Sequence, residues 1–385
     1  MLYRQFKEDN LSLLGFGCMR LPVVGGDQGA IDEKKTAQLL DRALEAGVNY
    51  FDTAYSYHLH QSEIVVGKVL GRHPRGSYFL ASKFPGHEKR SRYDAAAIFN
   101  EQLEKCGTEY FDYYLLHNVC EYSIETYLDD RWGIVDYLVE QRGNGRIRHL
   151  GFSAHGRLET VERFLDRFGD QMEFAQIELN YLDWVLQDAE ATVRMLRDRN
   201  LPIWVMEPMR GGALAHLGED AEARLKAMRP GESIASWAFR WVQGIEGVHM
   251  VLSGMNTPEQ LEDNLKTFSA ERPLSEEERR MLDEIAQGML DVVPCTQCRY
   301  CTRVCPKELD IPAFMFRYND AKFKPTFSQS MHVESLPDDK KPGACVRCGA
   351  CVEACPQGID IPEALHELQR LTDTLPRWAE LRKYD

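Results

Sequence analysis

The sequence predicts an α/β protein, in which a closed (β/α)8 barrel is followed by a smaller, mainly helical domain rich in cysteine. Short apolar runs alternate with longer amphipathic ones over about 250 residues, which is typical of repeated βα units. Beyond that region, eight of the eleven cysteines fall into two short runs. The chain has 385 residues, more than a single core usually holds. We therefore expect two domains, residues 1–290 and residues 291–385.

Eight strand candidates lie in the first region. They cover residues 11–17, 50–52, 78–83, 113–117, 147–153, 174–178, 203–206 and 249–252. The clearest helical patterns between them cover residues 36–46, 95–106, 158–168, 189–199 and 234–242. Eight strands that alternate with helices fit a closed barrel of the TIM type better than an open doubly wound sheet. Two more helices, near 258–268 and 275–290, are expected to complete the barrel.

The first strand does not continue into a dinucleotide fingerprint. Gly15-Phe16-Gly17 follows the strand, but Arg20 stands where the third glycine belongs, and Pro22 follows where a helix should begin. We interpret these glycines as turn residues of the barrel.

The cysteine-rich region contains two copies of the pattern C-x2-C-x2-C-x3-C-P. The copies consist of Cys295, Cys298, Cys301 and Cys305, and of Cys345, Cys348, Cys351 and Cys355. Such a run is typical of iron-sulfur proteins, because its thiolates supply several soft ligands to one small centre. Zinc is the weaker alternative, since structural zinc commonly uses two separated C-x2-C pairs. A disulfide framework is weaker still, because the N-terminal residues do not resemble a secretory signal.

The two runs form an internal repeat, because Leu309-Asp310-Ile311-Pro312 recurs as Ile359-Asp360-Ile361-Pro362 at the same offset. Two repeats predict two [4Fe-4S] clusters. The runs resemble those of two-cluster ferredoxins, in which the fourth cysteine of each run ligates the other cluster. This resemblance implies that Cys355 joins the first run and Cys305 joins the second. Helical patterns at 311–318 and 361–371 favour a mainly helical ferredoxin-like module.

Composition excludes two classes of partner. The 60 acidic and 46 basic side chains give a net charge of -14, which opposes nonspecific binding to nucleic acid. No apolar run approaches the ~20 residues that span a bilayer, and no polybasic tail marks a membrane surface. We expect a cytoplasmic protein in a reducing compartment, without a nucleic-acid or membrane partner.

Polar groups end several of the predicted strands, at the face where barrels of this type carry their chemistry. They are Asp52, Lys83 and His117, and Tyr57 follows shortly after the first of them. Tyr57 can donate a proton to a carbonyl oxygen if Lys83 lowers its pKa, with Asp52 pairing the lysine and His117 orienting the substrate. Each group alone would be interpreted as a buried, hydrogen-bonded residue. Their convergence on one rim favours a catalytic site.

These segments resemble the aldo-keto reductases. The matching motifs occur in order between about residues 11 and 265: Phe51-Asp52-Thr53-Ala54 with Tyr57, Ser82-Lys83, Leu115-Leu116-His117, Gly151-Phe152-Ser153 and Gln176-Ile177-Glu178-Leu179-Asn180. The resemblance implies a catalytic tetrad of Asp52, Tyr57, Lys83 and His117, with Tyr57 as the general acid in reduction and the base in oxidation. It also implies a nicotinamide cofactor that exchanges a hydride with a carbonyl or alcohol.

The same resemblance assigns cofactor contacts. Ser153 and Gln176 match positions that hold the nicotinamide carboxamide, whereas Gly254, with Ser253, and Asn264 match the adenine end. Glu207-Pro208 and Gly211-Gly212 resemble the loop after the seventh strand.

Three positions depart from the family pattern. Met206 stands where many members stack an aromatic ring on the nicotinamide. Gly254 or Met255 and Gln260 stand where many carry cations for the 2′-phosphate. NADH is therefore expected rather than NADPH, unless Lys266 or Arg210 compensates. Flavin is the alternative cofactor.

Three functions stay open at this stage. The first is reversible reduction of a small carbonyl compound, accompanied by electron transfer through the clusters to or from a partner such as a ferredoxin. The second is an electron-transfer protein whose barrel is a scaffold, and the third is a redox sensor whose clusters gate the barrel. His58, His60 and His155 are either substrate contacts or solvated loop residues.

Overall fold

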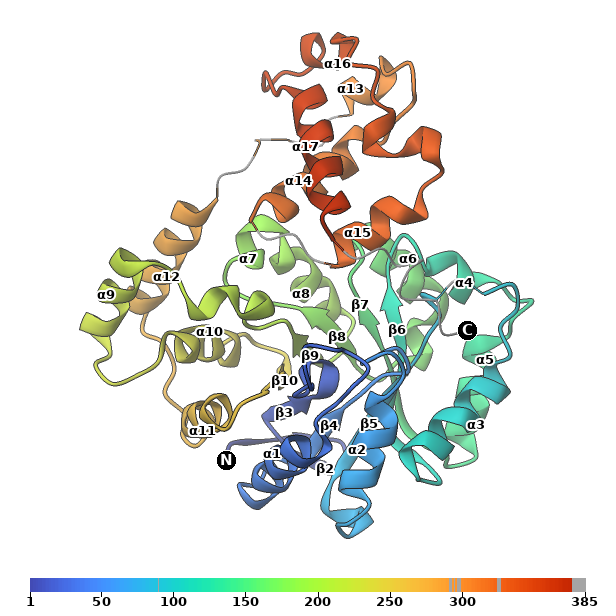
Figure 1. The fold of residues 1–385 in the computed structure, drawn as a ribbon, viewed down its shortest axis with the longest axis vertical. Helices are drawn as coiled ribbons and strands as arrows, with labels where there is room; N and C mark the ends of the chain where they lie inside the picture. The colour runs from blue at the N-terminus through green and yellow to red at the C-terminus, as the bar shows by residue number, and fades with distance from the viewer. Residues whose placement is uncertain (89, 291–292, 294, 296–298, 324–326, 376–385) are drawn as a thin grey trace. The chain divides into compact units, whose positions relative to one another are not determined.

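The computed structural model describes residues 1–375 except 89, 291–292, 294, 296–298 and 324–326. The chain forms two compact units (Figure 1). One contains Met1–Trp184 and Asp188–Leu282, and the other contains Val185–Gln187 and the chain from Asp283 onward. Among the described residues, none of the helices combines the length and apolar character needed to cross a bilayer.

Eight parallel strands close a barrel in the order β10-β3-β4-β5-β6-β7-β8-β9, which confirms the predicted fold. The strands are β3 Leu14–Gly17, β4 Tyr50–Asp52, β5 Phe79–Phe84, β6 Phe111–Val119, β7 Ile147–Ala154, β8 Ala175–Glu178, β9 Ile203–Met206 and β10 Val248–Ser253. Their residues are almost entirely buried, because a parallel barrel is covered on both faces.

The predicted first strand, 11–17, is wrong in one respect, since it is divided in two. β2 (Asp9–Ser12) pairs antiparallel with β1 (Tyr3–Phe6), and only β3 enters the barrel. The division falls at Ser12, whose backbone N–H donates to Asn49 Oδ1 and whose hydroxyl donates to the Leu14 carbonyl. The β1-β2 hairpin buries Phe6 and Leu11 among the aromatic side chains of the barrel interior.

Helices surround this barrel (Figure 1). They are α1 Glu33–Glu45, α2 Ser62–Leu70, α3 Ala95–Cys106, α4 Ile124–Leu128, α5 Ile134–Gly143, α6 Leu158–Phe168, α8 Ala189–Asp198, α9 Glu219–Met228, α10 Ile234–Gln243 and α11 Pro258–Thr267. Two further helices, α7 Asp183–Leu186 and α12 Glu276–Met289, begin in the barrel unit and end in the other unit. α1 begins three residues before the predicted start, because Asp32 caps it by accepting a hydrogen bond from the Lys35 N–H. Asp94 caps α3 in the same way, and Gly107 ends it in a left-handed conformation.

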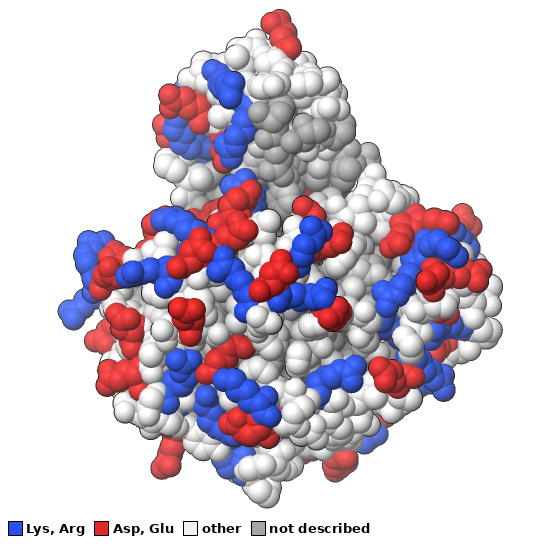
Figure 2. All heavy atoms as spheres, turned by 180° about the vertical axis from the view of Figure 1, so that it is seen from behind, with Lys and Arg blue, Asp and Glu red and all other residues white. Residues whose placement is uncertain are grey.

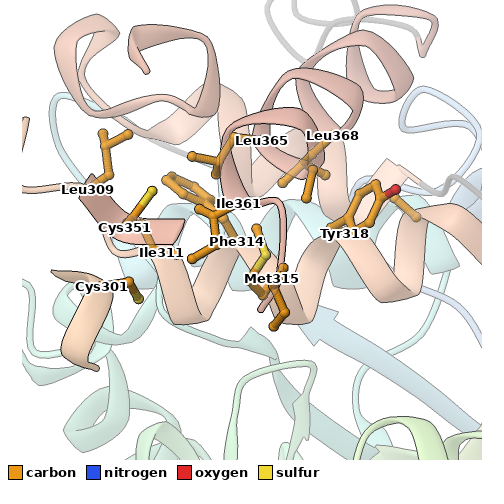
Figure 3. Packing of buried hydrophobic residues seen from close by; sticks show 13 residues of the cluster. Cys301, Leu309, Ile311, Phe314, Met315, Tyr318, Cys351, Ile361, Leu365 and Leu368 are labelled. Carbon is orange, nitrogen blue, oxygen red and sulfur yellow. The ribbon is translucent and has the colours of Figure 1, made fainter. Parts of the chain in front are cut away.

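Besides the ends of α7 and α12, the second unit contains five α-helices within the described residues: α13 Tyr300–Arg303, α14 Ile311–Phe323, α15 Phe327–Ser335, α16 Ala350–Glu353 and α17 Ile361–Asp373. α14 and α17 begin at the two copies of the Ile-Pro motif, so the sequence repeat becomes a helix pair. Figure 3 shows their buried faces in contact, with Phe314, Met315 and Leu365 beside Cys301 and Cys351. The cysteine runs are therefore built onto one small apolar core.

Charged side chains are mixed on the face of the molecule shown in Figure 2. Basic and acidic groups alternate there without a large patch of one sign.

Candidate active site

Lys83 lies at the centre of the polar groups at the carboxyl ends of the barrel strands. Its side chain is fully buried at the end of β5, and its ammonium donates to Asp52 Oδ1 (2.5 Å), the Thr53 carbonyl (2.8 Å) and the Tyr57 hydroxyl (3.2 Å). Burial alone would lower the pKa of Lys83, but the negative charge of Asp52 outweighs it and holds the pKa above its usual value. Lys83 is therefore a permanent cation beside the Tyr57 hydroxyl.

His117 completes the group from the end region of β6. The centroid of its ring lies 5.7 Å from that of Tyr57, with the two planes nearly perpendicular. Burial, together with the neighbouring charges of His87 and Lys83, lowers the pKa of His117 well below its usual value. Its Nδ1 is buried without a hydrogen-bond partner among the described residues. The structure thus places all four predicted tetrad residues together and makes the imidazole neutral.

The predicted lowering of the Tyr57 pKa is wrong in its net sign. Desolvation is the largest effect and raises the pKa of the phenol, and Lys83 lowers it by a smaller amount. The sequence indicates the nearby cation but not the extent of burial. Tyr57 consequently carries its proton at neutral pH.

Ser153 and Gln176 are buried at the ends of β7 and β8. Ser153 Oγ accepts a hydrogen bond from the Asn118 N–H, and Gln176 Nε2 donates to Met206 Sδ at 3.5 Å. Gln176 Oε1 is buried without a partner among the described residues. A buried amide oxygen of this kind fits an amide donor such as a nicotinamide carboxamide.

The residues expected at the adenine end lie around β10. Asn264 Nδ2 donates to Ser253 Oγ at 3.0 Å, and Gly254 is exposed beyond the strand. The two cations considered as partners of a 2′-phosphate are engaged elsewhere. Arg210 is buried and paired with Asp183 at 3.0 Å, and Lys266 donates to the Gly231 carbonyl.

Two residues near the tetrad carried no sequence motif. His87 is buried in the loop after β5, with its ring centroid 4.6 Å from that of His117. Glu63, in α2, is also buried and accepts hydrogen bonds from Ser82 Oγ and Gln102 Nε2. Desolvation raises the pKa of Glu63 to about 7. The sequence pointed to Glu63 only as an acidic residue within the mainly apolar segment Ser62–Leu70.

Two of the histidines that stayed open bond to backbone groups through their rings. His58 Nε2 accepts from the Leu21 N–H, and its Nδ1 lies 3.0 Å from the Gln28 carbonyl. His60 Nδ1 lies 3.0 Å from the Tyr55 carbonyl. His155 Nδ1 is 3.9 Å from Glu178 Oε2, beside the tetrad.

The cysteines of the second unit line two hollows of similar size. Cys295, Cys301 and Cys355 line one, with Ile311 and Met315 in its wall. The other contains the remaining described members of the two runs: Cys305, Cys345, Cys348 and Cys351. Cys298 lies outside the described residues.

The first hollow thus combines Cys295 and Cys301 of one run with the fourth cysteine of the other, and the second combines Cys345, Cys348 and Cys351 with Cys305. This grouping is the one that the resemblance to two-cluster ferredoxins implies. The donor set is soft thiolate, and apolar side chains such as Ile311 and Leu365 form much of the walls, beside Arg299 in the first hollow and Lys307 in the second. Such a set fits an iron-sulfur cluster.

The sequence model of the aldo/keto reductase family matches residues 13–287. That of the 4Fe-4S dicluster domain matches residues 294–359. Both matches agree with the resemblances stated from the motifs.

Individual relatives are distant but extend over the whole barrel. The chain is 24% identical over 299 residues to the uncharacterized oxidoreductase YqkF of Bacillus subtilis (strain 168), covering 71% of this chain and 92% of the relative. It is 22% identical over 324 residues to the NADH-specific methylglyoxal reductase of Escherichia coli (strain K12), covering 72% and 96%. The solved aldo/keto reductase of Klebsiella pneumoniae in complex with NADP and acetate has a TM-score of 0.58 at 20% identity, covering 73% and 93%, and shows the shared fold.

Proposed function

The chain belongs to the aldo-keto reductase family and carries a 4Fe-4S dicluster domain, and on this premise we propose that it reversibly reduces a small carbonyl compound with Tyr57 as the general acid. The observation that carries the proposal is the contact of one buried ammonium, Lys83 Nζ, with both Asp52 and Tyr57. An oxidoreductase and a methylglyoxal reductase are among its relatives and are matched over 92% and 96% of their length.

In reduction, Tyr57 donates its proton to the substrate oxygen. Lys83 stabilises the phenolate that remains, because its positive charge lies 3.2 Å from the phenol oxygen. Asp52 keeps that ammonium in place and charged. The neutral imidazole of His117 donates one N–H to the same substrate oxygen and so orients the carbonyl toward Tyr57. In oxidation, the phenolate takes the proton back.

A nicotinamide cofactor, when bound, supplies or accepts the hydride. Gln176 Oε1 and Ser153 Oγ would hold its carboxamide, Met206 would contact the ring, and Gly254 and Asn264 would line the adenine end. We propose NADH, because Arg210 and Lys266 are engaged elsewhere and the relative from Escherichia coli is NADH-specific. Bound flavin in the purified protein would contradict this assignment.

The substitution Tyr57→Phe tests the role of Tyr57. Loss of the general acid should lower turnover by ~10²- to 10⁴-fold with small aldehydes and ketones, including methylglyoxal. The matched control is Tyr55→Phe, because the Tyr55 hydroxyl is bonded to Glu101 rather than to Lys83. The control should retain turnover. Unchanged turnover in Tyr57→Phe would remove the proposed mechanism, whereas activity equally lost in both variants would indicate damaged folding.

We further propose that the eight cysteines of the two runs, including Cys298, bind two [4Fe-4S] clusters in a domain covering residues 291–385, with residues 1–290 as the catalytic domain. The clusters would exchange electrons with a redox partner protein such as a ferredoxin. Cys355 would ligate the cluster of Cys295 and Cys301, and Cys305 that of Cys345, Cys348 and Cys351. The support is the grouping of the thiols around the two hollows.

Anaerobic alkylation followed by mass spectrometry tests this exchange. In Cys355→Ala, Cys295 and Cys301 should become reactive while Cys345, Cys348 and Cys351 stay protected. Cys305→Ala is the matched control and should show the reverse pattern. Reactivity confined to the run that carries the substitution would contradict the exchange.

A further inference from the structure

A group of polar side chains lies at the amino end of the barrel, at the opposite end of β7 from Ser153. Glu8 lies in the turn between β1 and β2, Asp9 begins β2, and His149 is the third residue of β7. The ring of Phe6, at the end of β1, packs edge-to-face on that of His149, with the centroids 5.2 Å apart. The hairpin is therefore attached to the barrel at this point, and we call Glu8, Asp9 and His149 the hairpin site.

The three side chains of the hairpin site direct one donor atom each into the same space. His149 Nε2 lies 3.3 Å from Asp9 Oδ2 and 3.8 Å from Glu8 Oε1. All three donor atoms lie within 4.8 Å of one another. Ligand atoms bound at about 2.1 Å to a tetrahedral zinc ion are about 3.4 Å apart. The observed spacing is close to this value, and the Glu8 side chain, which is 63% exposed, can rotate to complete it.

His149 provides evidence for a ligand that is independent of the two acids. Its side chain is 3% exposed, and its Nδ1 lies 2.7 Å from Glu173 Oε2. Metal-binding histidines usually donate their second ring N–H to a carboxylate in this way. The contact of Nε2 with Asp9 is not aligned as a hydrogen bond, so this buried nitrogen lacks a well-placed partner among the described residues. A nitrogen beside two carboxylates and aligned with neither is placed for an ion that all three groups would share.

Arg148 is the competing partner of the two acids. Its guanidinium lies 3.0 Å from Asp9 Oδ1 and 3.8 Å from Glu8 Oε1. The other oxygen of Asp9, Oδ2, accepts a hydrogen bond from the Tyr113 hydroxyl at 2.8 Å. A carboxylate oxygen has two lone pairs, so Oδ2 can keep this bond and also ligate an ion. Arg148 therefore balances part of the negative charge and does not occupy the space between Oδ2 and His149 Nε2.

We propose that Glu8, Asp9 and His149 bind a zinc ion, with water as the fourth ligand. Imidazole and carboxylate groups suit zinc, and the exposed side of the site leaves a position for water. The ion takes the place of the proton on His149 Nε2, which is released to solvent. It would join the turn of the hairpin to β7 and so stabilise the hairpin. The inference does not depend on the proposed reductase function, because Lys83 lies at the carboxyl end of the barrel.

Zinc binding to the full-length, anaerobically purified protein tests the proposal. With one equivalent of Zn²⁺, X-ray absorption at the zinc edge should show nitrogen and oxygen ligands at about 2.0–2.1 Å and no sulfur at about 2.3 Å. This measurement distinguishes the hairpin site from zinc bound by the cysteines of the second unit. Hydrogen exchange should become slower in β1 and β2 when zinc is added and stay unchanged in β5.

The substitution Glu8→Gln removes one ligand at an exposed position, where the fold tolerates the change. The dissociation constant of Zn²⁺, measured by titration calorimetry, should rise by about tenfold or more. Glu271→Gln is the matched control, because Glu271 is 69% exposed and pairs with Arg4 of the same hairpin. The control should keep the affinity of the unsubstituted protein.

Nitrogen and oxygen ligands at the zinc, together with weaker binding in Glu8→Gln alone, would support the inference. Sulfur ligands would overturn it, because the zinc would then be bound by cysteines. Equal affinities in Glu8→Gln and Glu271→Gln would overturn it as well, and so would the absence of measurable zinc binding. In each of these cases the ion pairs of Arg148 would be the whole role of the two acids.

Discussion

The barrel site and the cysteine-rich unit both bring reactive groups together, but they differ in burial and in what surrounds those groups. Lys83 is fully buried, whereas only Cys301 and Cys351 are buried among the described cysteines of the two runs. The ammonium of Lys83 is surrounded by acceptors that the protein supplies, namely Asp52, the Thr53 carbonyl and Tyr57. The described thiols of the second unit instead gather around two hollows with mostly apolar walls. The barrel therefore pairs its buried charge with groups of its own chain. The grouped thiols of the second unit fit a bound ligand that would join them.

Removal of iron should produce the largest difference in stability between the two regions. If the thiolates hold clusters, their removal costs the second unit binding energy on the order of 10 kcal/mol, which is more than a small core supplies. Hydrogen exchange should then become fast in α14 and α17 and stay unchanged in the barrel strands. Equal protection of α14 and α17 with and without iron would show that the apolar core alone holds this unit together.

The substitution Lys83→Met tests whether the barrel site depends on its internal pairing. It leaves the Asp52 carboxylate buried without its cation, which should lower the free energy of unfolding of the barrel by about 3–5 kcal/mol. Urea unfolding followed by tryptophan fluorescence measures the loss. The control Lys68→Met removes an exposed partner of Glu33, and it should cost less than about 1 kcal/mol. A similar small loss for Lys83→Met would mean that water reaches Asp52.

The carboxyl group of Glu63 is buried, and among the described residues it is hydrogen-bonded by Ser82 and Gln102 rather than ion-paired with a cation. Its pKa is raised from the ordinary value of 4.5 to about 7, mainly by desolvation. The folded state therefore loses stability as the pH rises from 4.5 through 7, by up to about 3 kcal/mol.

The variant Glu63→Gln carries no charge and should be close to the unsubstituted protein at pH 4.5 and more stable than it at pH 8. Its amide oxygen can accept the same bonds from Ser82 and Gln102. Unfolding titrations at the two pH values measure this. Glu125→Gln, at an exposed position, should differ by less than about 1 kcal/mol at both values. A pH-independent difference for Glu63→Gln would contradict the raised pKa.

The smallest expected effect concerns His149 in β7. Burial opposes the charge of His149, but hydrogen bonds and charges of Asp9 and Glu173 outweigh it and raise the pKa. The stabilisation from this charged group is complete below about pH 6.5, the unfolded value, and is lost as the pH rises through the folded value.

The stability difference between the unsubstituted protein and His149→Gln should therefore be largest at pH 5.5 and smaller at pH 9. Glu173→Gln should reduce this pH dependence, because Glu173 Oε2 lies 2.7 Å from His149 Nδ1. Thermal unfolding at several pH values measures both effects. A difference that is constant with pH would show that His149 is neutral in the fold.

Much of the barrel could be predicted because apolar runs and their spacing mark strands that are covered on both faces. The internal repeat likewise indicated which helices, α14 and α17, correspond. The division of the first strand at Ser12 was missed, because it depends on a bond to Asn49, far along the chain. His87 was missed because its loop carries no motif, and only the fold places it against His117.

By itself, the sequence determined the fold class and the two cysteine runs, and it indicated that Asp52, Tyr57, Lys83 and His117 would lie together, because residue type and local spacing are sufficient for these features. The tertiary structure decided how these residues act on one another. It made burial the dominant effect on the Tyr57 pKa, it grouped Cys305 and Cys355 with the opposite runs, and it brought Glu8 and Asp9 to His149. Desolvation and contacts between distant segments arise only when the chain is closed, so local pattern does not contain them.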